Sequence, residues 1–217
     1  MRDLIVFGAG GFAQEVAWVV ESMNESLSEI DRWNLLGYAD DDISRAGLTL
    51  YGYQVLSNEH VASRDPEKLW FHCAIGRNGA REMVATRLEA SGMRAATLIH
   101  PSVMRAKFVE VGEGSYVAPG VVLSPMVVIG RHVLVNQRSS VGHDTKLDDF
   151  SQICPGAQIN ASCTIERGAF VGSNASVHQG RRIGAAAVVG ANAQVIRDVA
   201  AKTTVAGVPA QVLSRGV

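Results

Sequence analysis

The stretch VLVNQRSSVGHDTKLDDFSQICPGAQI, residues 133–159, decides the fold. An aliphatic residue stands at every sixth position of this stretch, beginning with Val135. A six-residue period with one buried aliphatic side chain per period is typical of a β-helix with three short faces in each coil. Followed in both directions, the register covers fifteen positions, all Val, Leu or Ile: Val111, Val117, Leu123, Ile129, Val135, Val141, Leu147, Ile153, Ile159, Ile165, Val171, Val177, Ile183, Val189 and Val195.

Three hexads make one coil, so Val111 is expected to stack beneath Ile129 and Leu147 in one of three aliphatic columns. About five coils fit between Val111 and Val199. Such a narrow prism has no room for large rings. This fits a chain with only 6% aromatic residues and 22 glycines. We therefore predict an all-β, parallel β-helix over residues 100–217.

The first half of the chain, residues 1–99, has a different pattern. Short apolar runs predict strands at 4–7, 35–39, 69–75 and 95–99, and apolar spacings of three and four predict helices at 12–23 and 81–91. Gly8, Gly10 and Gly11 separate the first strand from the first helix, and Asp40 follows the second strand. A strand, a glycine turn, a helix and then a strand ending in Asp predict an α/β, Rossmann-like βαβ domain that binds a nucleotide.

Charge and cysteine content narrow the range of functions. The formal net charge is −1, which argues against binding to nucleic acid or to a membrane surface. Cys73, Cys154 and Cys163 form no CxxC pair, so a disulfide framework is not expected and a reducing compartment is. No apolar run approaches the ~20 residues of a membrane span. We expect a cytoplasmic protein.

Motifs along nearly the full chain resemble those of one enzyme family. They are Val6-Phe7-Gly8-Ala9-Gly10-Gly11-Phe12, Gly37-Tyr38-Ala39-Asp40-Asp41, Ala74-Ile75-Gly76-Arg77-Asn78 followed by Arg81, Leu98-Ile99-His100-Pro101-Ser102, Asn136 with Ser139 to Val141 and His143-Asp144, and Val205-Ala206-Gly207-Val208-Pro209-Ala210. The chain resembles the hexapeptide-repeat sugar acetyltransferases of the sialic-acid O-acetyltransferase and bacillosamine-pathway N-acetyltransferase type. The resemblance implies a left-handed β-helix, acetyl-CoA as co-substrate, a nucleotide-linked sugar as acceptor in glycan synthesis, and a homotrimer with acyl sites between neighbouring prisms.

His143 is the predicted catalytic base. Acyl transfer from a thioester needs a group that takes the acceptor's proton, and a histidine suits this near neutral pH. His143 lies two residues after Val141, where a corner turns side chains outward. Asp144 is expected to hold the imidazole tautomer. The alternative is that both are ordinary polar corner residues.

The resemblance also implies binding residues. The predicted substrate-binding residues are Gly8, Gly10, Gly11, Phe12, Asp40, Asp41, Gly76 and Arg77, and the predicted cofactor-binding residues are Gln152, Ala161, Gly172 and Ala191. Several depart from the family pattern: Phe12 stands where the family usually carries His, Gln152 where some members carry a second His, and Ala161 and Ala191 where it carries Gly. The Ala161 backbone N–H is still able to face the thioester carbonyl. Arg197 and Lys202 are candidates for the CoA phosphates, or are solvated surface charges.

Three functions remain open from the sequence. The first is N-acetylation of a nucleotide-linked amino sugar, favoured by Asp40 and Asp41. The second is O-acetylation of a sugar hydroxyl, as in sialic acid. The third is a non-catalytic trimeric scaffold with a ligand-sensing first domain. His132 and His178 share no register with His143, so no metal site is expected within one subunit.

Overall fold

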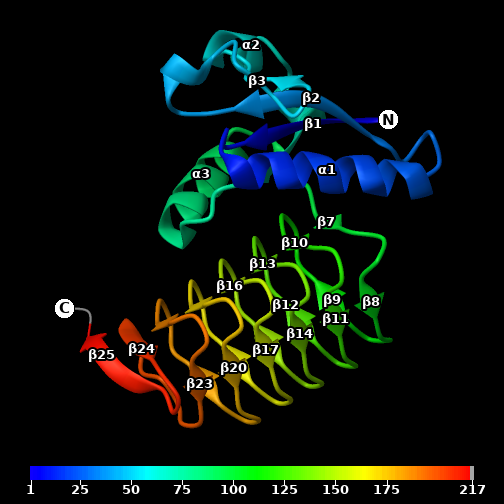
Figure 1. The fold of residues 1–217 in the computed structure, drawn as a ribbon. Helices are drawn as coiled ribbons and strands as arrows, with labels where there is room; N and C mark the ends of the chain where they lie inside the picture. Colours follow the sequence, from blue (N-terminus) through cyan, green and yellow to red (C-terminus); the bar gives the residue numbers. More distant parts are fainter. Residues whose placement is uncertain (216–217) are drawn as a thin grey trace. The chain divides into compact units, whose positions relative to one another are not determined.

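The computed structural model describes residues 1–215, and the chain divides into two compact units, Met1–Pro101 and Ser102–Val217. Figure 1 shows the chain from its blue N-terminal strand to its red C-terminal strands. The elements of the first unit are β1 (Arg2–Phe7), α1 (Gly11–Ser26), β2 (Trp33–Ala39), a 3-10 turn (Ile43–Arg45), β3 (Thr49–Leu50), β4 (Tyr53–Gln54), α2 (Asn58–Ala62), a second 3-10 turn (Pro66–Lys68), β5 (Trp70–Cys73), α3 (Asn78–Ala90), β6 (Arg94–Ala95) and β7 (Leu98–Ile99).

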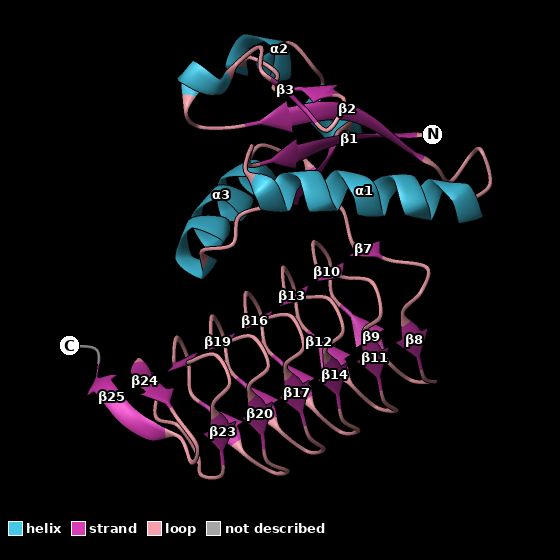
Figure 2. Ribbon diagram, viewed as in Figure 1, coloured by secondary structure: helices cyan, strands magenta, loops and turns pink. Residues whose placement is uncertain are grey.

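The first unit is built on a parallel sheet with the strand order β2-β1-β5-β6. The apolar run 4–7 forms the buried part of the central strand β1, as expected for a strand with neighbours on both sides. Helix α1 packs on β1 and β2, and α3 packs on β5 and β6 (Figure 2). The Rossmann-like α/β class predicted for this half is confirmed.

Beyond shifts of a few residues at the ends of elements, the structure differs from the prediction in three ways. The expected strand 95–99 is two strands, since β6 ends at Ala95 and β7 begins at Leu98. Helix α3 begins at Asn78 instead of Arg81, because Asn78 and Gly79 are poor helix formers and add nothing to the apolar spacing that predicted the helix. The short hairpin β3–β4 and helix α2 were not predicted, because two-residue strands and a five-residue helix leave no readable period.

The second unit is a left-handed β-helix of short parallel strands, as predicted. One face is a sheet of β8 (Met104–Arg105), β11 (Val122–Leu123), β14 (Ser140–Val141), β17 (Gln158–Ile159), β20 (Ser176–Val177) and β23 (Gln194–Val195). A second face contains β9 (Glu110–Val111), β12 (Val128–Ile129), β15 (Lys146–Leu147), β18 (Thr164–Ile165) and β21 (Arg182–Ile183). The third contains β10 (Tyr116–Val117), β13 (Leu134–Val135), β16 (Gln152–Ile153), β19 (Phe170–Val171), β22 (Val188–Val189), β24 (Thr203–Ala206) and the antiparallel β25 (Gln211–Arg215).

The predicted aliphatic columns fill the prism. Fourteen of the fifteen hexad positions are buried, and Val111 is half-buried because β9 is the end strand of its sheet. A second inward position lies two residues before each of them except Ile183, which follows the half-exposed Arg181; an example is Val121 before Leu123. Strand alternation turns the residue between them outward, so Val122 is exposed. Two small inward residues per face therefore account for a core without large rings.

Left-handed backbone conformations mark the corners of the coils. They recur every six residues, with glycine at some corners and other residues at the rest: Phe108, Met126, His132, Arg138, Asp144, Phe150, Ser162, Asn174, Ala186 and Asn192 all have φ between 53° and 62°. A positive φ takes the chain out of the extended conformation and turns it from one face to the next, so that side chains on either side of it need not alternate. The corners are therefore the places where adjacent residues can face the same way.

Replacing a column residue is expected to cost far more stability than replacing its outward neighbour. Leu147→Ala leaves a cavity in a close-packed prism and is expected to lower the free energy of unfolding by about 2–5 kcal/mol. Lys146→Ala, on the exposed side of the same strand, is the matched control and is expected to cost less than about 1 kcal/mol. Urea unfolding measures both, and equal losses would contradict the columns.

Candidate functional site

The side chains of His143 and Asp144 contact each other at one corner of the β-helix. The corner joins β14 to β15, and Asp144 takes the left-handed conformation there, with φ of 58°. His143 Nδ1 lies 2.7 Å from Asp144 Oδ2, although the two residues are adjacent in sequence. The corner thus brings together two side chains that a straight strand would turn to opposite faces.

This pairing fixes how the imidazole can act. A carboxylate accepts a hydrogen bond, so Asp144 selects the tautomer with the proton on Nδ1. Nε2 then carries a lone pair and makes no hydrogen bond to any other residue within 1–215. Both side chains are 58% exposed, so an acceptor molecule can reach Nε2 from solvent. The arrangement suits a base that takes a proton from a bound ligand.

Ala161 lies at the equivalent corner position one coil further on. The Ser162 N–H donates to the His143 carbonyl at 2.8 Å, and the Asp144 N–H donates to the Pro125 carbonyl at 3.2 Å. Backbone hydrogen bonds thereby hold the His143 corner against both neighbouring coils. A Cβ added to Gly142 would lie 2.5 Å from the Ala161 nitrogen, so the two backbones approach closely beside the imidazole. The Ala161 N–H donates to no other residue in the described range.

The other predicted cofactor residues lie elsewhere on the same prism. Gln152 is in β16 on the third face, nine-tenths buried, and its Oε1 has no partner within residues 1–215. Gly172 follows β19 and Ala191 follows β22, at the corner that leads from the third face to the first. A Cβ on Gly172 would lie 2.6 Å from the Ala191 nitrogen, so these two residues share a corner that is not the His143 corner. One chain therefore presents the predicted cofactor residues in two separate groups.

The predicted substrate residues gather at the carboxyl ends of β1, β2 and β5 in the first unit. A cavity of about 330 Å³ there is lined by Phe7, Gly8, Ala39, Asp40, Asp41, Ile75, Arg77, Ala80 and Val84. Gly76 lies between two lining residues, and Gly11 is the first residue of α1. Phe12 is half-buried in the first turn of that helix. This is the crevice where open α/β sheets bind ligands.

Two residues of the crevice have structural reasons for their identity. Gly8 has φ of 111°, and a Cβ on it would lie 2.7 Å from the Ala74 carbonyl oxygen, so only glycine fits between β1 and β5. Asp40 accepts hydrogen bonds from the Ala9 N–H at 2.8 Å and the Asp42 N–H at 3.0 Å. These bonds fix the Asp40 carboxylate beside the glycine turn. Gly10 and Gly11 have open space around them.

Arg81 supports this crevice in a way that the sequence did not reveal. Its side chain is 1% exposed, and its guanidinium donates to the Ile75 carbonyl at 2.9 Å and to Asn78 Oδ1 at 3.0 Å. Burial lowers the pKa of Arg81 to about 10, which still leaves it charged at neutral pH. Arg81 therefore holds the turn that carries Gly76 and Arg77. Only its position after the Ala74–Asn78 motif pointed to it in the sequence.

The three cysteines and His132 are buried side chains. Cys73, Cys154 and Cys163 are free and buried, and burial raises the pKa of Cys73 to about 12 and that of Cys154 to about 11. His132 stacks on Phe150, with ring centroids 5.0 Å apart. Within residues 1–215, no three His, Cys, Asp or Glu side chains group as metal ligands. No helix in that range is long and apolar enough to cross a membrane.

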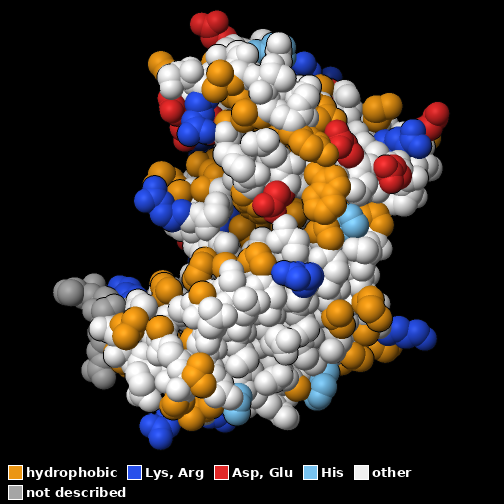
Figure 3. Space-filling model, viewed as in Figure 1, with side chains coloured by type: hydrophobic (Ala, Val, Ile, Leu, Met, Phe, Trp, Pro, Cys, Tyr) orange, Lys and Arg blue, Asp and Glu red, His pale blue; other side chains and the backbone are white. Residues whose placement is uncertain are grey.

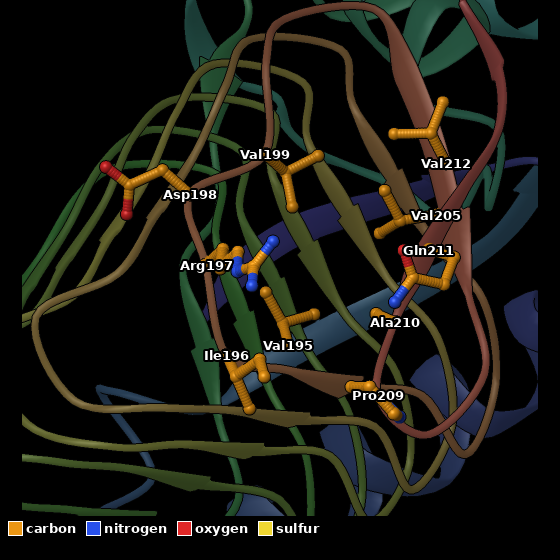
Figure 4. Close-up of a pocket in the computed structure, with 10 residues that line it drawn as sticks. All are labelled: Val195, Ile196, Arg197, Asp198, Val199, Val205, Pro209, Ala210, Gln211 and Val212. Carbon is orange, nitrogen blue, oxygen red and sulfur yellow. The ribbon is translucent and has the colours of Figure 1, made fainter.

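A small cavity of about 190 Å³ lies at the C-terminal end of the β-helix. Figure 4 shows Val195, Val199 and Val205 facing the segment that runs from Pro209 to Val212. Arg197 also lines this cavity, whereas Lys202 does not. The last coil is thus closed by its own chain.

Several known proteins are similar to this chain in fold and in sequence. Residues 3–88 match the family model described as the PglD N-terminal domain. GDP-perosamine N-acetyltransferase of Escherichia coli is 31% identical over 176 residues, which cover 81% of this chain and 77% of the relative. The acetyltransferase domain of PglB from Neisseria gonorrhoeae, solved in complex with acetyl coenzyme A, is 28% identical, with a TM-score of 0.87 and coverage of 98% of this chain and 99% of its own.

The chain belongs to the hexapeptide-repeat sugar acetyltransferase family. A variant of perosamine N-acetyltransferase from Caulobacter crescentus, solved with CoA and GDP-perosamine, is 25% identical, with a TM-score of 0.88 and coverage of 99% of this chain and 98% of its own. The family membership and the acetyl-CoA-dependent sugar acetyltransferase class predicted from the sequence are confirmed.

Proposed function

We propose that this acetyltransferase moves the acetyl group of acetyl-CoA to the amine of a nucleotide-linked amino sugar, with His143 as general base. The observation that carries the proposal is the 2.7 Å contact between His143 Nδ1 and Asp144 Oδ2 on an exposed corner. Two relatives named as perosamine N-acetyltransferases support an amine on a nucleotide-linked sugar over a sugar hydroxyl. A scaffold protein has no need of such a pair.

The chemistry follows from which atoms the corner presents. His143 Nε2 takes a proton from the acceptor amine as its nitrogen attacks the thioester carbonyl carbon. Asp144 keeps the proton on Nδ1 and stabilises the positive charge that the ring gains. In this proposal the Ala161 N–H donates to the oxygen that becomes negative in the tetrahedral intermediate. The intermediate then expels the CoA thiolate, and His143 returns its proton to the sulfur.

The site is proposed to form between copies of the chain in a homotrimer. Gln152, Gly172 and Ala191 lie on a different part of the prism from His143, so a neighbouring copy is needed to bring the two groups to one ligand. An apolar patch of Met104, Phe108, Val122 and Met126 covers the first coils, and Figure 3 shows hydrophobic side chains gathered there. Phe108 and Met126 occupy the same corner position as Asp144, two coils and one coil earlier.

The glycine turn and the crevice of the first unit are proposed to hold the sugar nucleotide. Gly10 and Gly11 open the 16-residue helix α1, whose first N–H groups favour a phosphate. Arg77 adds a positive charge to the crevice. Gln152, Ala161, Gly172 and Ala191 are proposed to contact acetyl-CoA. Three free, buried cysteines fit a cytoplasmic, reducing compartment.

A substrate panel tests the acceptor. UDP-, dTDP- and GDP-linked amino sugars are supplied with acetyl-CoA, and release of CoA is measured with a thiol reagent. Turnover is expected with at least one amine, and mass spectrometry of the product should show an amide. The matched hydroxyl sugars and free sialic acid serve as controls. Turnover of a hydroxyl with none of the amines would overturn N-acetylation in favour of O-acetylation.

Loss of the base is expected to reduce turnover with little effect on the fold. His143→Ala should lower kcat by about 10²–10⁴-fold, the usual contribution of general-base catalysis. Asp144→Asn should lower it less, because the imidazole remains. His60→Ala, which removes an exposed histidine of the first unit, is the control and should retain wild-type kcat. A fall of less than about tenfold in His143→Ala would remove His143 from the mechanism.

Charge in the apolar patch is expected to separate the subunits. Light scattering of the wild type should give a mass three times the 23.1 kDa of the chain. Phe108→Asp places a carboxylate on a side chain that is 77% exposed in the single chain, and Asp tolerates the left-handed backbone there. The mass of the variant in solution should fall below that of a trimer, and the variant should lose most of its activity. Ile30→Asp, at an equally exposed apolar residue of the first unit, should stay trimeric. A monomeric wild type would refute the shared site.

A further inference from the structure

Asp40 separates two cavities of the first unit. The cavity of about 330 Å³ beside Gly8 and Arg77 lies on one side of it. A second cavity of about 390 Å³ also has Asp40 in its wall, together with Asp42, Ile43, Ala46, Leu56, Ser57, Asn58 and Glu59. Both volumes lie in the range of small-ligand pockets, which is roughly 300–1,000 Å³. The proposed function uses only the first cavity.

The position of Asp40 orders the parts of a nucleotide along this groove. In α/β nucleotide-binding units, the phosphates lie at the glycine turn after the first strand, and the acid that ends the second strand faces the ribose. Asp40 directly follows β2 and is tied to the glycine turn through the Ala9 N–H. With phosphates at the turn and ribose at Asp40, the base continues past Asp40, into the second cavity.

We infer that the second cavity binds the nucleobase and that the Glu59 carboxylate selects guanine. The inference rests on the proposed sugar-nucleotide site, and it names the class of nucleotide that this site accepts.

The walls of the second cavity suit a flat heterocycle. Ile43, Ala46 and Leu56 supply apolar contacts for the faces of a ring, and Ser57, Asn58 and Glu59 supply polar groups for its edge. Leu56 is fixed by its N–H, which donates to the Tyr38 carbonyl in β2 at 2.7 Å. The base would therefore pack against a wall that is tied directly to the sheet.

Three carboxylates line this cavity, and Glu59 is the available one, because the two Asp40 oxygens accept from the Ala9 and Asp42 N–H groups. Asp42 is occupied, because its Oδ1 accepts from the Ser44 N–H and hydroxyl and its Oδ2 lies 3.5 Å from Arg45 Nε. The Glu59 side chain has no hydrogen-bond or ion-pair partner in the described part of the chain. Its two oxygens can therefore bond to a ligand without breaking a contact of the protein.

A carboxylate distinguishes the bases by their edges. Guanine presents two adjacent donors, N1–H and the exocyclic amine, which match the two oxygens of one carboxylate. Uracil and thymine place N3–H between two carbonyl oxygens that repel a carboxylate. Adenine and cytosine each pair one amine with a ring nitrogen that is an acceptor. Only guanine makes two parallel hydrogen bonds to Glu59, so GDP should bind more tightly than the other nucleoside diphosphates.

Calorimetric titration of the full chain with GDP, ADP, UDP and CDP tests this inference. GDP is expected to bind at least about tenfold more tightly than the other three, within the range that one good bidentate contact to a base provides. Glu59→Gln keeps the shape of the side chain but puts a donor beside the guanine amine. It should weaken GDP binding by about tenfold or more and leave UDP binding unchanged. Glu29→Gln, in the loop before β2, is the control and should match the wild type.

Two results would overturn the inference. One is equal affinity of the wild type for GDP and UDP. The other is a preference for GDP that survives in Glu59→Gln. If amino sugars linked to other nucleotides are then acetylated, the proposed function stands and only guanine selection fails. If no nucleoside diphosphate binds and no nucleotide-linked amino sugar is acetylated, both fail together.

Discussion

Backbone hydrogen bonding between successive coils is the constraint on which the β-helix depends. A two-residue strand cannot satisfy its own N–H and C=O groups, so each strand pairs with the strands 18 residues before and after it, through N–H groups that donate to carbonyls 17 residues further along. The Gly130 N–H donates to the Leu147 carbonyl at 2.7 Å, and the Gly142 N–H donates to the Ile159 carbonyl at the same distance. A single inserted residue would move every later side chain off its column. This requirement explains why the hexads run without interruption from Val111 to Val195.

The candidate catalytic pair is a local consequence of the same constraint. Each coil has to turn at three corners, and the turn is made in the left-handed backbone region. At Asp144 this turn brings a carboxylate back toward the imidazole of the preceding residue. Hydrogen bonds from the coils on either side hold the corner in place. The imidazole is thus oriented by the backbone of the fold, without a partner from a distant part of the sequence.

The sequence predicted the structural features that come from a repeating residue pattern, and it did not predict those that lack one. The aliphatic columns, the parallel sheet of the first unit and His143 as a corner residue all follow from spacing. Whether Asp144 could reach His143 stayed open, because that depends on a backbone angle and not on residue type. Between β2 and β5, the elements are too short to show a pattern, so the second cavity was not foreseen. The role of Arg81 needs knowledge of burial, which a lone arginine does not reveal.

The two units differ in how freely their side chains can be replaced. Near His143 the coils approach so closely that a Cβ on Gly142 would lie 2.5 Å from the next backbone, so the corner has little freedom to accept other side chains. The stretch between β2 and β5 has no repeat to preserve, and its residues Ser57, Asn58 and Glu59 are exposed. A substitution there alters a cavity wall without disturbing a ladder of hydrogen bonds. Side-chain changes are therefore tolerated better in the segment that does not repeat than at the closely packed corners of the β-helix.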